Sequence, residues 1–149
     1  MSVDYVVASL QPLSFDGPAP YTLEQFLEQT GPIELPPRWT DLETQLRNAI
    51  AAARGGEKWR RPAAGCDLHW QNRIAAAFAE KDPLKRETLV DRVFWDAAGE
   101  LTPVASPLSA GALQTYYLRL KIALKRNRAS AEAGNAAFDR LTAATKQVL

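Results

Sequence analysis

Apolar residues recur at helical spacing through most of the chain, and the clearest case lies between residues 40 and 54. The apolar stripe there has positions i, i+4, i+7, i+8 and i+11, which are Leu42, Leu46, Ala49, Ile50 and Ala53. Thr40 and Glu43 have the spacing of a capping box, and Gly55-Gly56 supplies a stop. The pattern therefore predicts an amphipathic helix from Thr40 to about Arg54.

Two further helices are predicted in the middle of the chain. The first begins near Asp67, and its apolar face consists of Trp70, Ile74, Ala77 and Phe78. The second begins at Asp82-Pro83, an N-cap residue followed by proline at the first helical position, and stops near Gly99. Its wide apolar stripe consists of Leu84, Leu89, Val90, Val93, Phe94 and Ala97. This width predicts a central helix covered by its neighbours.

The last third of the chain predicts two helices that meet near Ser130. Ser106 or Ser109 caps a long helix that runs to about Arg128. Its inward residues are Leu113, Tyr116, Tyr117, Leu120, Ala123 and Leu124. Ser130 then opens a final helix, whose apolar positions are Ala137, Phe138, Leu141, Ala144 and Val148.

The N-terminal segment is rich in proline and less regular. Residues 3–10 are a short apolar run that fits either a strand or a short helix, and residues 11–20 predict a loop. Thr22 and Gln25 form a capping box for a short helix ending near Gln29. Residues 31–39, with three prolines, predict an extended stretch.

These elements together predict an all-α fold. We expect one domain over residues 1–149, with an irregular or short-helix segment at 1–39 and a bundle at 40–149, in all about five to six helices. Composition favours the same class, because 25 of the 149 residues are alanine, the best helix former. Collagen-like, disulfide-rich and disordered classes are excluded.

The formal net charge of +1 conceals an uneven distribution. Residues 1–50 carry −5, residues 51–100 carry +1 and residues 101–149 carry +5. The small total argues against a chain that coats nucleic acid through bulk charge. The separated charge indicates that the two ends pair with each other or face different partners.

The sequence carries no signature of export or membrane insertion. Asp4 stands where a signal peptide has positive charge, and no apolar run approaches the roughly 18–20 residues that span a bilayer. The single cysteine, Cys66, permits no internal disulfide, and we expect it to be a small, partly buried residue. These features predict a cytoplasmic protein.

Candidate catalytic chemistry is sparse. Asp91, Asp96 and Glu100 lie on or near one helix, but interleaved basic residues favour a solvated charged face over acid–base work. His69 is the only histidine, and with Cys66 it gives too few ligands for zinc. We therefore expect no catalytic, cofactor-binding or metal-binding residues, and no enzymatic activity.

Two basic segments are the candidate partner-binding residues: Lys58, Trp59, Arg60 and Arg61 in a linker, and Arg119, Lys121, Lys125, Arg126 and Arg128 on the long helix. They fit an acidic protein partner. The alternative is a nucleic-acid-binding module, since an aromatic residue among cations is typical of such sites. Trp70 and Trp95 are predicted core residues, and core packing is favoured over an interface for Trp39 and Trp59.

Several segments together resemble a bacterial family of unknown function that is encoded in V-type ATPase operons. The resemblance is carried by Tyr5–Phe15 with Pro20–Leu27, by Asp82–Asp96 with Glu100-Leu101, and by the tyrosine-containing stretch Leu113–Leu124. Asp41–Arg54 is similar to a segment of the C-type (or d-type) coupling component of V-type ATP synthases and other rotary ATPases.

The resemblance implies a function without catalysis. It implies an all-helical adaptor in an ion-transporting rotary motor, which couples the central stalk to the membrane ring through protein–protein contacts. The implied partners are stalk and ring subunits, with no small-molecule substrate or cofactor. The implied place is the inner face of the membrane, reached indirectly through the complex.

Overall fold

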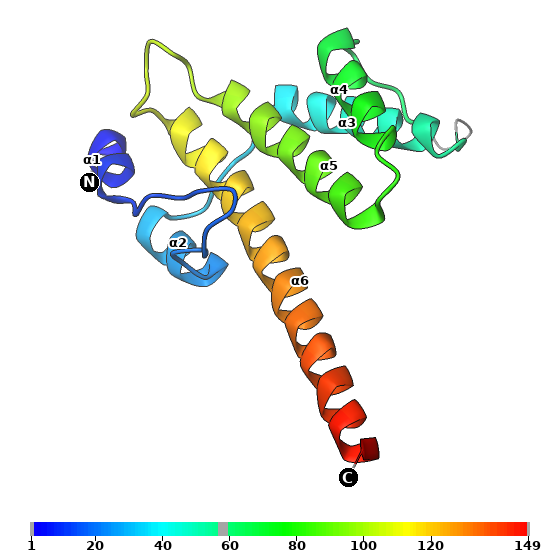
Figure 1. Ribbon diagram of the computed structural model, residues 1–149. Coiled ribbons are helices and arrows are strands. Elements are labelled where there is room, and N and C mark those ends of the chain that lie inside the picture. The colour runs from blue at the N-terminus through cyan, green and yellow to red at the C-terminus, as the bar shows by residue number, and fades with distance from the viewer. Residues whose placement is uncertain (1, 57–59, 149) are drawn as a thin grey trace.

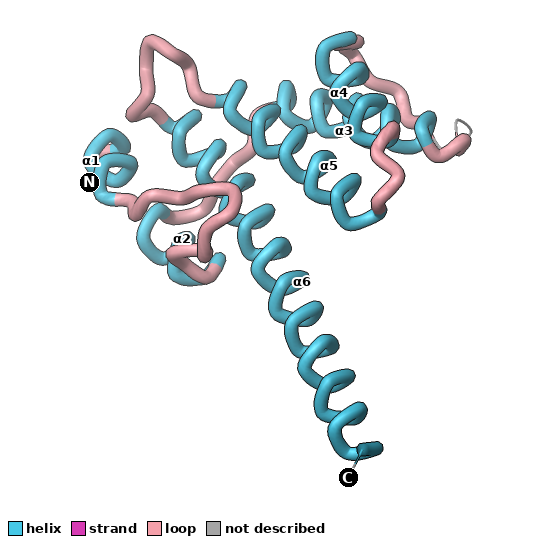
Figure 2. The backbone as a smooth tube through the Cα atoms, in the orientation of Figure 1, coloured by secondary structure: helices cyan, strands magenta, loops and turns pink. Residues whose placement is uncertain are grey.

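The computed structural model of this chain describes residues 2–56 and 60–148, with side chains described through residue 144. The described residues form six α-helices and one 3-10 turn, and they contain no strand (Figure 2). In chain order these are α1 Val3–Ser9, α2 Leu23–Thr30, α3 Pro37–Ala53, α4 Leu68–Phe78, α5 Pro83–Ala98, η2 Gly99–Leu101 and α6 Ala110–Val148. The predicted all-α class is confirmed, and residues 3–9 are helical.

Local capping sets most helix starts where the sequence predicts them. The Thr22 hydroxyl accepts the Gln25 N–H at 3.2 Å, and the Gln25 side chain accepts the Thr22 N–H at 2.9 Å, which completes the capping box. Asp67 and Asp82 each accept a backbone N–H two residues further on, at 3.0 Å. Such caps satisfy donors that the first turn leaves unpaired.

Helix α3 begins three residues earlier than predicted. Pro36 is its N-cap and Pro37 its first residue, so the extended stretch ends there, and Thr40 lies inside the helix. Proline suits this position because its fixed φ is already helical and its missing N–H needs no partner. The predicted stop is confirmed, since Gly55 has φ 75° and the Gly56 N–H reaches back into the last turn.

Helix α6 is one continuous helix of 39 residues, so the predicted break at Ser130 is wrong. We name residues 129–144 the α6 arm; it projects away from the rest of the chain (Figure 1). All its residues are exposed except the half-exposed Thr142, and Phe138 is 68% exposed. The arm residues predicted to face a core, Ala137, Phe138, Leu141 and Ala144, are therefore exposed instead of buried. Alanine-rich sequence continues the helix through Ser130, because neighbouring helix formers outweigh one weak one.

The main core lies where α3, α4, α5 and the first half of α6 meet. Its buried residues are Trp39, Leu46, Trp70, Ile74, Val93, Ala97, Ala98, Leu101 and Leu118. A second cluster joins Phe15, Trp95 and Ala123. The predicted burial of Trp39, Trp70 and Trp95 is thus confirmed, whereas Leu84 and Leu89 on α5 are exposed.

The N-terminal segment packs along the first half of α6 (Figure 1). Phe26 of α2 is fully buried and stacks on Tyr116 with ring centroids 5.2 Å apart. The Tyr116 hydroxyl donates to the Gln11 carbonyl at 2.7 Å, and burial raises the pKa of Tyr116 to about 12. The Ala19 N–H donates to Asn127 at 2.8 Å. These contacts hold a proline-rich stretch with little helix of its own against α6.

The segment between α3 and α4 runs over the surface, and this is why Cys66 is exposed rather than partly buried. The Asp41 carboxylate holds the segment by accepting the N–H groups of Ala64 and Gly65. A hydrogen bond from the Gln45 side chain, followed by those from the backbone, lowers the pKa of Asp41.

In the described residues, no helix combines the length and the apolar content that crossing a membrane requires.

Two glycines on α6 predict opposite effects of the same substitution. In the exposed α6 arm, a Cβ on Gly134 meets nothing within 4 Å, whereas a Cβ on Gly111 collides with the backbone carbonyl of Leu101. We expect Gly134→Ala to stabilise the arm helix by about 1 kcal/mol, measured as slower amide exchange over residues 130–144. Gly111→Ala lowers the melting temperature. Equal effects at the two sites would contradict this account.

Candidate functional site

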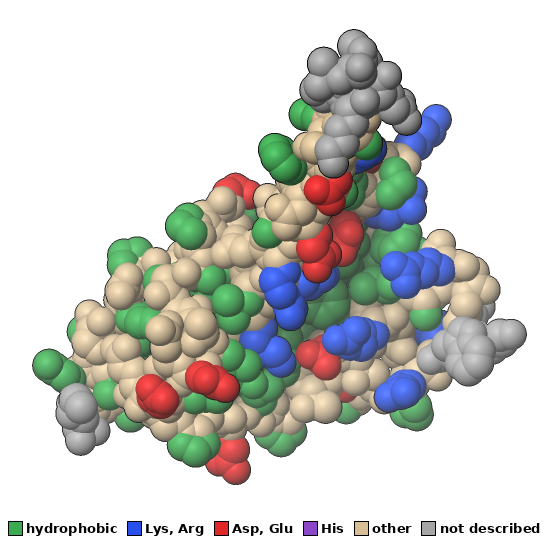
Figure 3. All heavy atoms as spheres, turned by 90° about the horizontal axis from the view of Figure 1, so that it is seen from below, with side chains coloured by type: hydrophobic (Ala, Val, Ile, Leu, Met, Phe, Trp, Pro, Cys, Tyr) green, Lys and Arg blue, Asp and Glu red, His purple; other side chains and the backbone are tan. Residues whose placement is uncertain are grey.

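An open groove of about 670 Å³ runs between α3, α5 and α6. Its apolar floor consists of Trp39, Ile50, Val90, Phe94, Leu118 and Ile122. Its basic side chains are Arg47, Arg54, Lys121, Lys125 and Arg128, and we call the whole feature the basic groove. Figure 3 shows this face of the molecule, where a hollowed apolar surface is surrounded by lysine and arginine side chains.

Helical spacing divides the five predicted partner-binding residues of α6. Lys121, Lys125 and Arg128 stand at i, i+4 and i+7, so they share one face and line the basic groove. Arg119 and Arg126 are seven residues apart and lie on roughly the opposite face. The structure therefore brings three of the five together and assigns the other two to packing inside the fold.

Arg119 fastens α6 to α5. Its Nε donates to the Trp95 carbonyl at 3.0 Å, and its guanidinium lies 5.1 Å from the Trp95 ring centroid. Burial lowers the pKa of Arg119 from its ordinary value. Arg119 is therefore a half-buried cation whose contacts lie within the fold.

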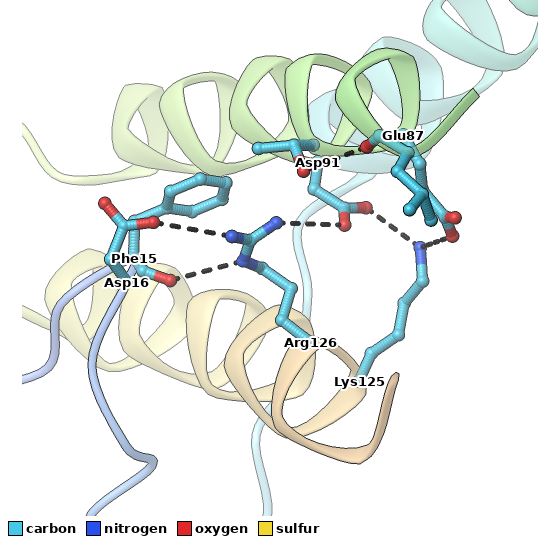
Figure 4. A network of polar contacts seen from close by, with 8 residues as sticks. Phe15, Asp16, Glu87, Asp91, Lys125 and Arg126 are labelled. Atoms are coloured by element: carbon cyan, nitrogen blue, oxygen red, sulfur yellow. Dashed lines mark hydrogen bonds and ion pairs between the residues drawn. The ribbon is translucent and has the colours of Figure 1, made fainter. Parts of the chain in front are cut away.

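Arg126 and Asp91 join three segments of the chain (Figure 4). Asp91 is 7% exposed, and its carboxylate pairs with Lys125 at 2.9 Å and with Arg126 at 3.7 Å. The Arg126 guanidinium lies 3.9 Å from the Phe15 ring centroid and also pairs with Asp16 at 3.4 Å. The N-terminal loop, α5 and α6 therefore meet at these charges.

The prediction that Asp91, Asp96 and Glu100 form a solvated charged face is wrong for Asp91. This residue is buried, and its carboxylate is covered by cations of α6. Asp96 is half-exposed and pairs with Arg73 at 2.7 Å and Arg92 at 3.4 Å. Glu100 is exposed. Sequence spacing could not reveal the difference, because a second helix must pack before one carboxylate on a charged helix becomes buried.

The linker candidates lie apart from α6 along the chain. Arg60 and Arg61 are exposed, and Asn48 of α3 holds the backbone of Arg61 through hydrogen bonds of 2.7 and 2.8 Å. Lys58 and Trp59 lie outside the described residues. His69 is exposed, with its ring 4.7 Å from the Trp70 ring, edge to face.

Two cations of the basic groove were missed from the sequence. Arg47 on α3 and Arg54, the C-cap residue of α3, stand at i and i+7 and flank the apolar position Ile50. Their guanidinium groups lie 5.9 Å from the Phe94 ring and 5.6 Å from the Phe78 ring. The i, i+7 spacing beside an apolar stripe was the available signal in the sequence. It indicates a shared site only once the packing of α6 places Lys121, Lys125 and Arg128 around the same groove.

The charges of the basic groove do not cancel within it. Its two carboxylates already pair with neighbours: Glu43 with Arg47 at 3.6 Å, and Asp91 with the α6 cations. Arg54, Lys121 and Arg128 are exposed and form no ion pair with any described residue. An excess of three positive charges around an apolar floor favours an acidic, partly apolar partner.

Comparisons with protein-family models, with curated proteins and with solved structures find no match to this chain. The chemistry of the basic groove is therefore inferred from its own residues and their geometry. In residues 2–56 and 60–148, no group of three or more His, Cys, Asp or Glu side chains is placed to hold a metal ion. The buried indole N–H of Trp39, at the floor of the groove, has no hydrogen-bond partner among these residues.

Neutralising Asp91 is expected to destabilise the fold. Asp91→Asn leaves Arg126 and Lys125 without their shared carboxylate, and we expect a loss of about 2–4 kcal/mol in the free energy of unfolding, measured by urea denaturation. Glu87→Gln is the matched control, because Glu87 is 60% exposed and pairs with Lys125 at 3.6 Å. Glu87→Gln is expected to lower the free energy of unfolding by less than about 1 kcal/mol. Similar losses in both variants would show that Asp91 has no special role.

Proposed function

We propose that this protein is a non-catalytic component of a bacterial V-type rotary ATPase, which couples the central stalk to the membrane ring through protein–protein contacts. The observation that carries the docking part of the proposal is the basic groove, with its apolar floor and uncancelled positive charge. The resemblance of the sequence to proteins encoded in V-type ATPase operons supports the host complex.

The shape of the molecule supports a mechanical role. A part that passes torque needs a rigid body and surfaces that fit its neighbours, and it needs no reacting groups. Helix α6 supplies such rigidity: its 39 residues span about 60 Å and connect the packed helices to the projecting arm. The basic groove offers one surface. The α6 arm, which projects away from the packed helices (Figure 1), offers a second, as an adaptor between two bodies requires.

The residues that carry the resemblance take part in packing. Phe15 and Trp95 contact each other edge to face with ring centroids 5.5 Å apart, and Asp82 caps α5. A resemblance made of such residues supports a shared fold directly and a shared host complex indirectly. The proposed partners are therefore stalk and ring subunits, and the proposed place is the inner face of the membrane.

The nucleic-acid-binding alternative stays a prediction. Its candidate cations include Arg119 and Arg126, which contact Trp95 and Phe15 within the fold. Lys121, Lys125 and Arg128 line the basic groove beside apolar side chains, and a phosphate backbone offers no apolar surface to cover these. Titration with an oligonucleotide at increasing salt separates the two functions, because binding through phosphates weakens steeply with salt.

The proposal predicts physical association with the motor. The tagged full-length chain, expressed at its native level, is expected to co-purify with rotary ATPase stalk and ring subunits. Deleting its gene is expected to lower ATP-driven ion transport relative to ATP hydrolysis in membrane vesicles. A tagged cytoplasmic protein of similar size is the control for capture. A complete, fully coupled ATPase isolated from cells lacking the protein refutes the proposal.

A further inference from the structure

We propose that the basic groove binds one acidic amphipathic helix of a partner protein, with the apolar stripe of that helix on the groove floor and its carboxylates against the groove cations. The inference rests on the proposed docking function and names the kind of partner segment. It does not depend on which complex supplies that segment.

The floor of the groove provides the apolar part of this match. Ile50 of α3, Phe94 of α5 and Ile122 of α6 are each only partly buried, although they belong to three packed helices. They leave apolar surface open along a trough rather than at an isolated point. A second hollow of about 320 Å³ shares Ile50 and continues the trough to Phe78. An elongated apolar trough between helices is a surface that accepts an amphipathic helix.

The charges specify the sign of the partner. Arg54, the C-cap residue of α3, lines the trough on one side, and Lys121 and Arg128 on α6 line it on the other. All three are exposed, and none has a carboxylate partner among the described residues. A helix lying in the trough with glutamates or aspartates along both borders of its apolar stripe would meet cations on both sides. A basic helix would meet repulsion on both sides.

The described acidic residues of the N-terminal third leave Arg54, Lys121 and Arg128 of the groove without a carboxylate partner. Of the acidic side chains in residues 1–50, Asp16 pairs with Arg126 outside the groove, and Asp41 holds the segment before α4. Only Glu43 lines the groove, where Arg47 already pairs with it. The positive charge of the groove thus remains available to another molecule.

A peptide titration tests the inference on the full-length protein. The probe is a synthetic helix of about 18 residues, with leucines at helical spacing and glutamates on the flanking positions, labelled for fluorescence anisotropy. One control peptide has the same composition in an order that destroys the apolar stripe. A second has lysine in place of each glutamate. Preferential binding of the acidic amphipathic peptide is the expected result.

Two double variants locate the binding. Lys121→Glu with Arg128→Glu reverses two groove cations and is expected to weaken the acidic peptide at least about tenfold. Lys81→Glu with Lys85→Glu makes the same change in charge at exposed positions outside the groove and is expected to change affinity less than about twofold. Circular dichroism and melting temperature confirm that both variants are folded.

Three results overturn the inference: equal binding of the scrambled acidic peptide, equal weakening by both double variants, and displacement of the peptide by an oligonucleotide. The outcome is separable from that of the proposed function. Peptide binding without co-purification of ATPase subunits supports the groove and rejects the host. Undiminished co-purification of Lys121→Glu with Arg128→Glu, together with absent peptide binding, rejects the groove and retains the host.

Discussion

The ion pairs of Asp91 hold three parts of the molecule in one arrangement. A buried carboxylate on α5 that pairs with both Lys125 and Arg126 favours this rotation of α6, because a different rotation would separate the acid from these two cations. Arg126 in turn covers Phe15, which brings the N-terminal loop to the same point. The apolar clusters supply adhesion between the helices, but these directional contacts select which faces of α6 turn inward and which turn outward.

The orientation of α6 determines what the protein presents to others. With Arg119 and Arg126 turned toward α5 and the N-terminal loop, Lys121 and Arg128 turn toward α3. The helix crosses the packed helices along its first half only, so a trough opens beside it and its second half projects as the α6 arm (Figures 1 and 3). The basic groove is therefore a consequence of how α6 is fastened.

Much of the fold could be predicted because its signals are local. The box at Thr22, the cap at Asp82 and the stop after α3 each depend on a few neighbouring residues, and each is found. The break predicted at Ser130 failed because capping chemistry cannot tell a helix start from a polar residue inside a longer helix. The prediction of the candidate site was incomplete because it depends on tertiary packing. Sequence shows that α6 is basic, but only packing assigns Arg119 inward and Lys121 outward.

The uneven charge along the chain can be compared with the ion pairs of the structure. The first 50 residues carry −5 and the last 49 carry +5, which suggests that the two ends neutralise each other in one fold. Among the described residues, however, one ion pair joins these regions, between Asp16 and Arg126. Most of the positive charge on α6 is therefore either used by α5, through Asp91, or turned toward the groove. The N-terminal acids therefore do not neutralise the groove: Arg54, Lys121 and Arg128 stay exposed, and their charges give this face of the molecule a positive potential.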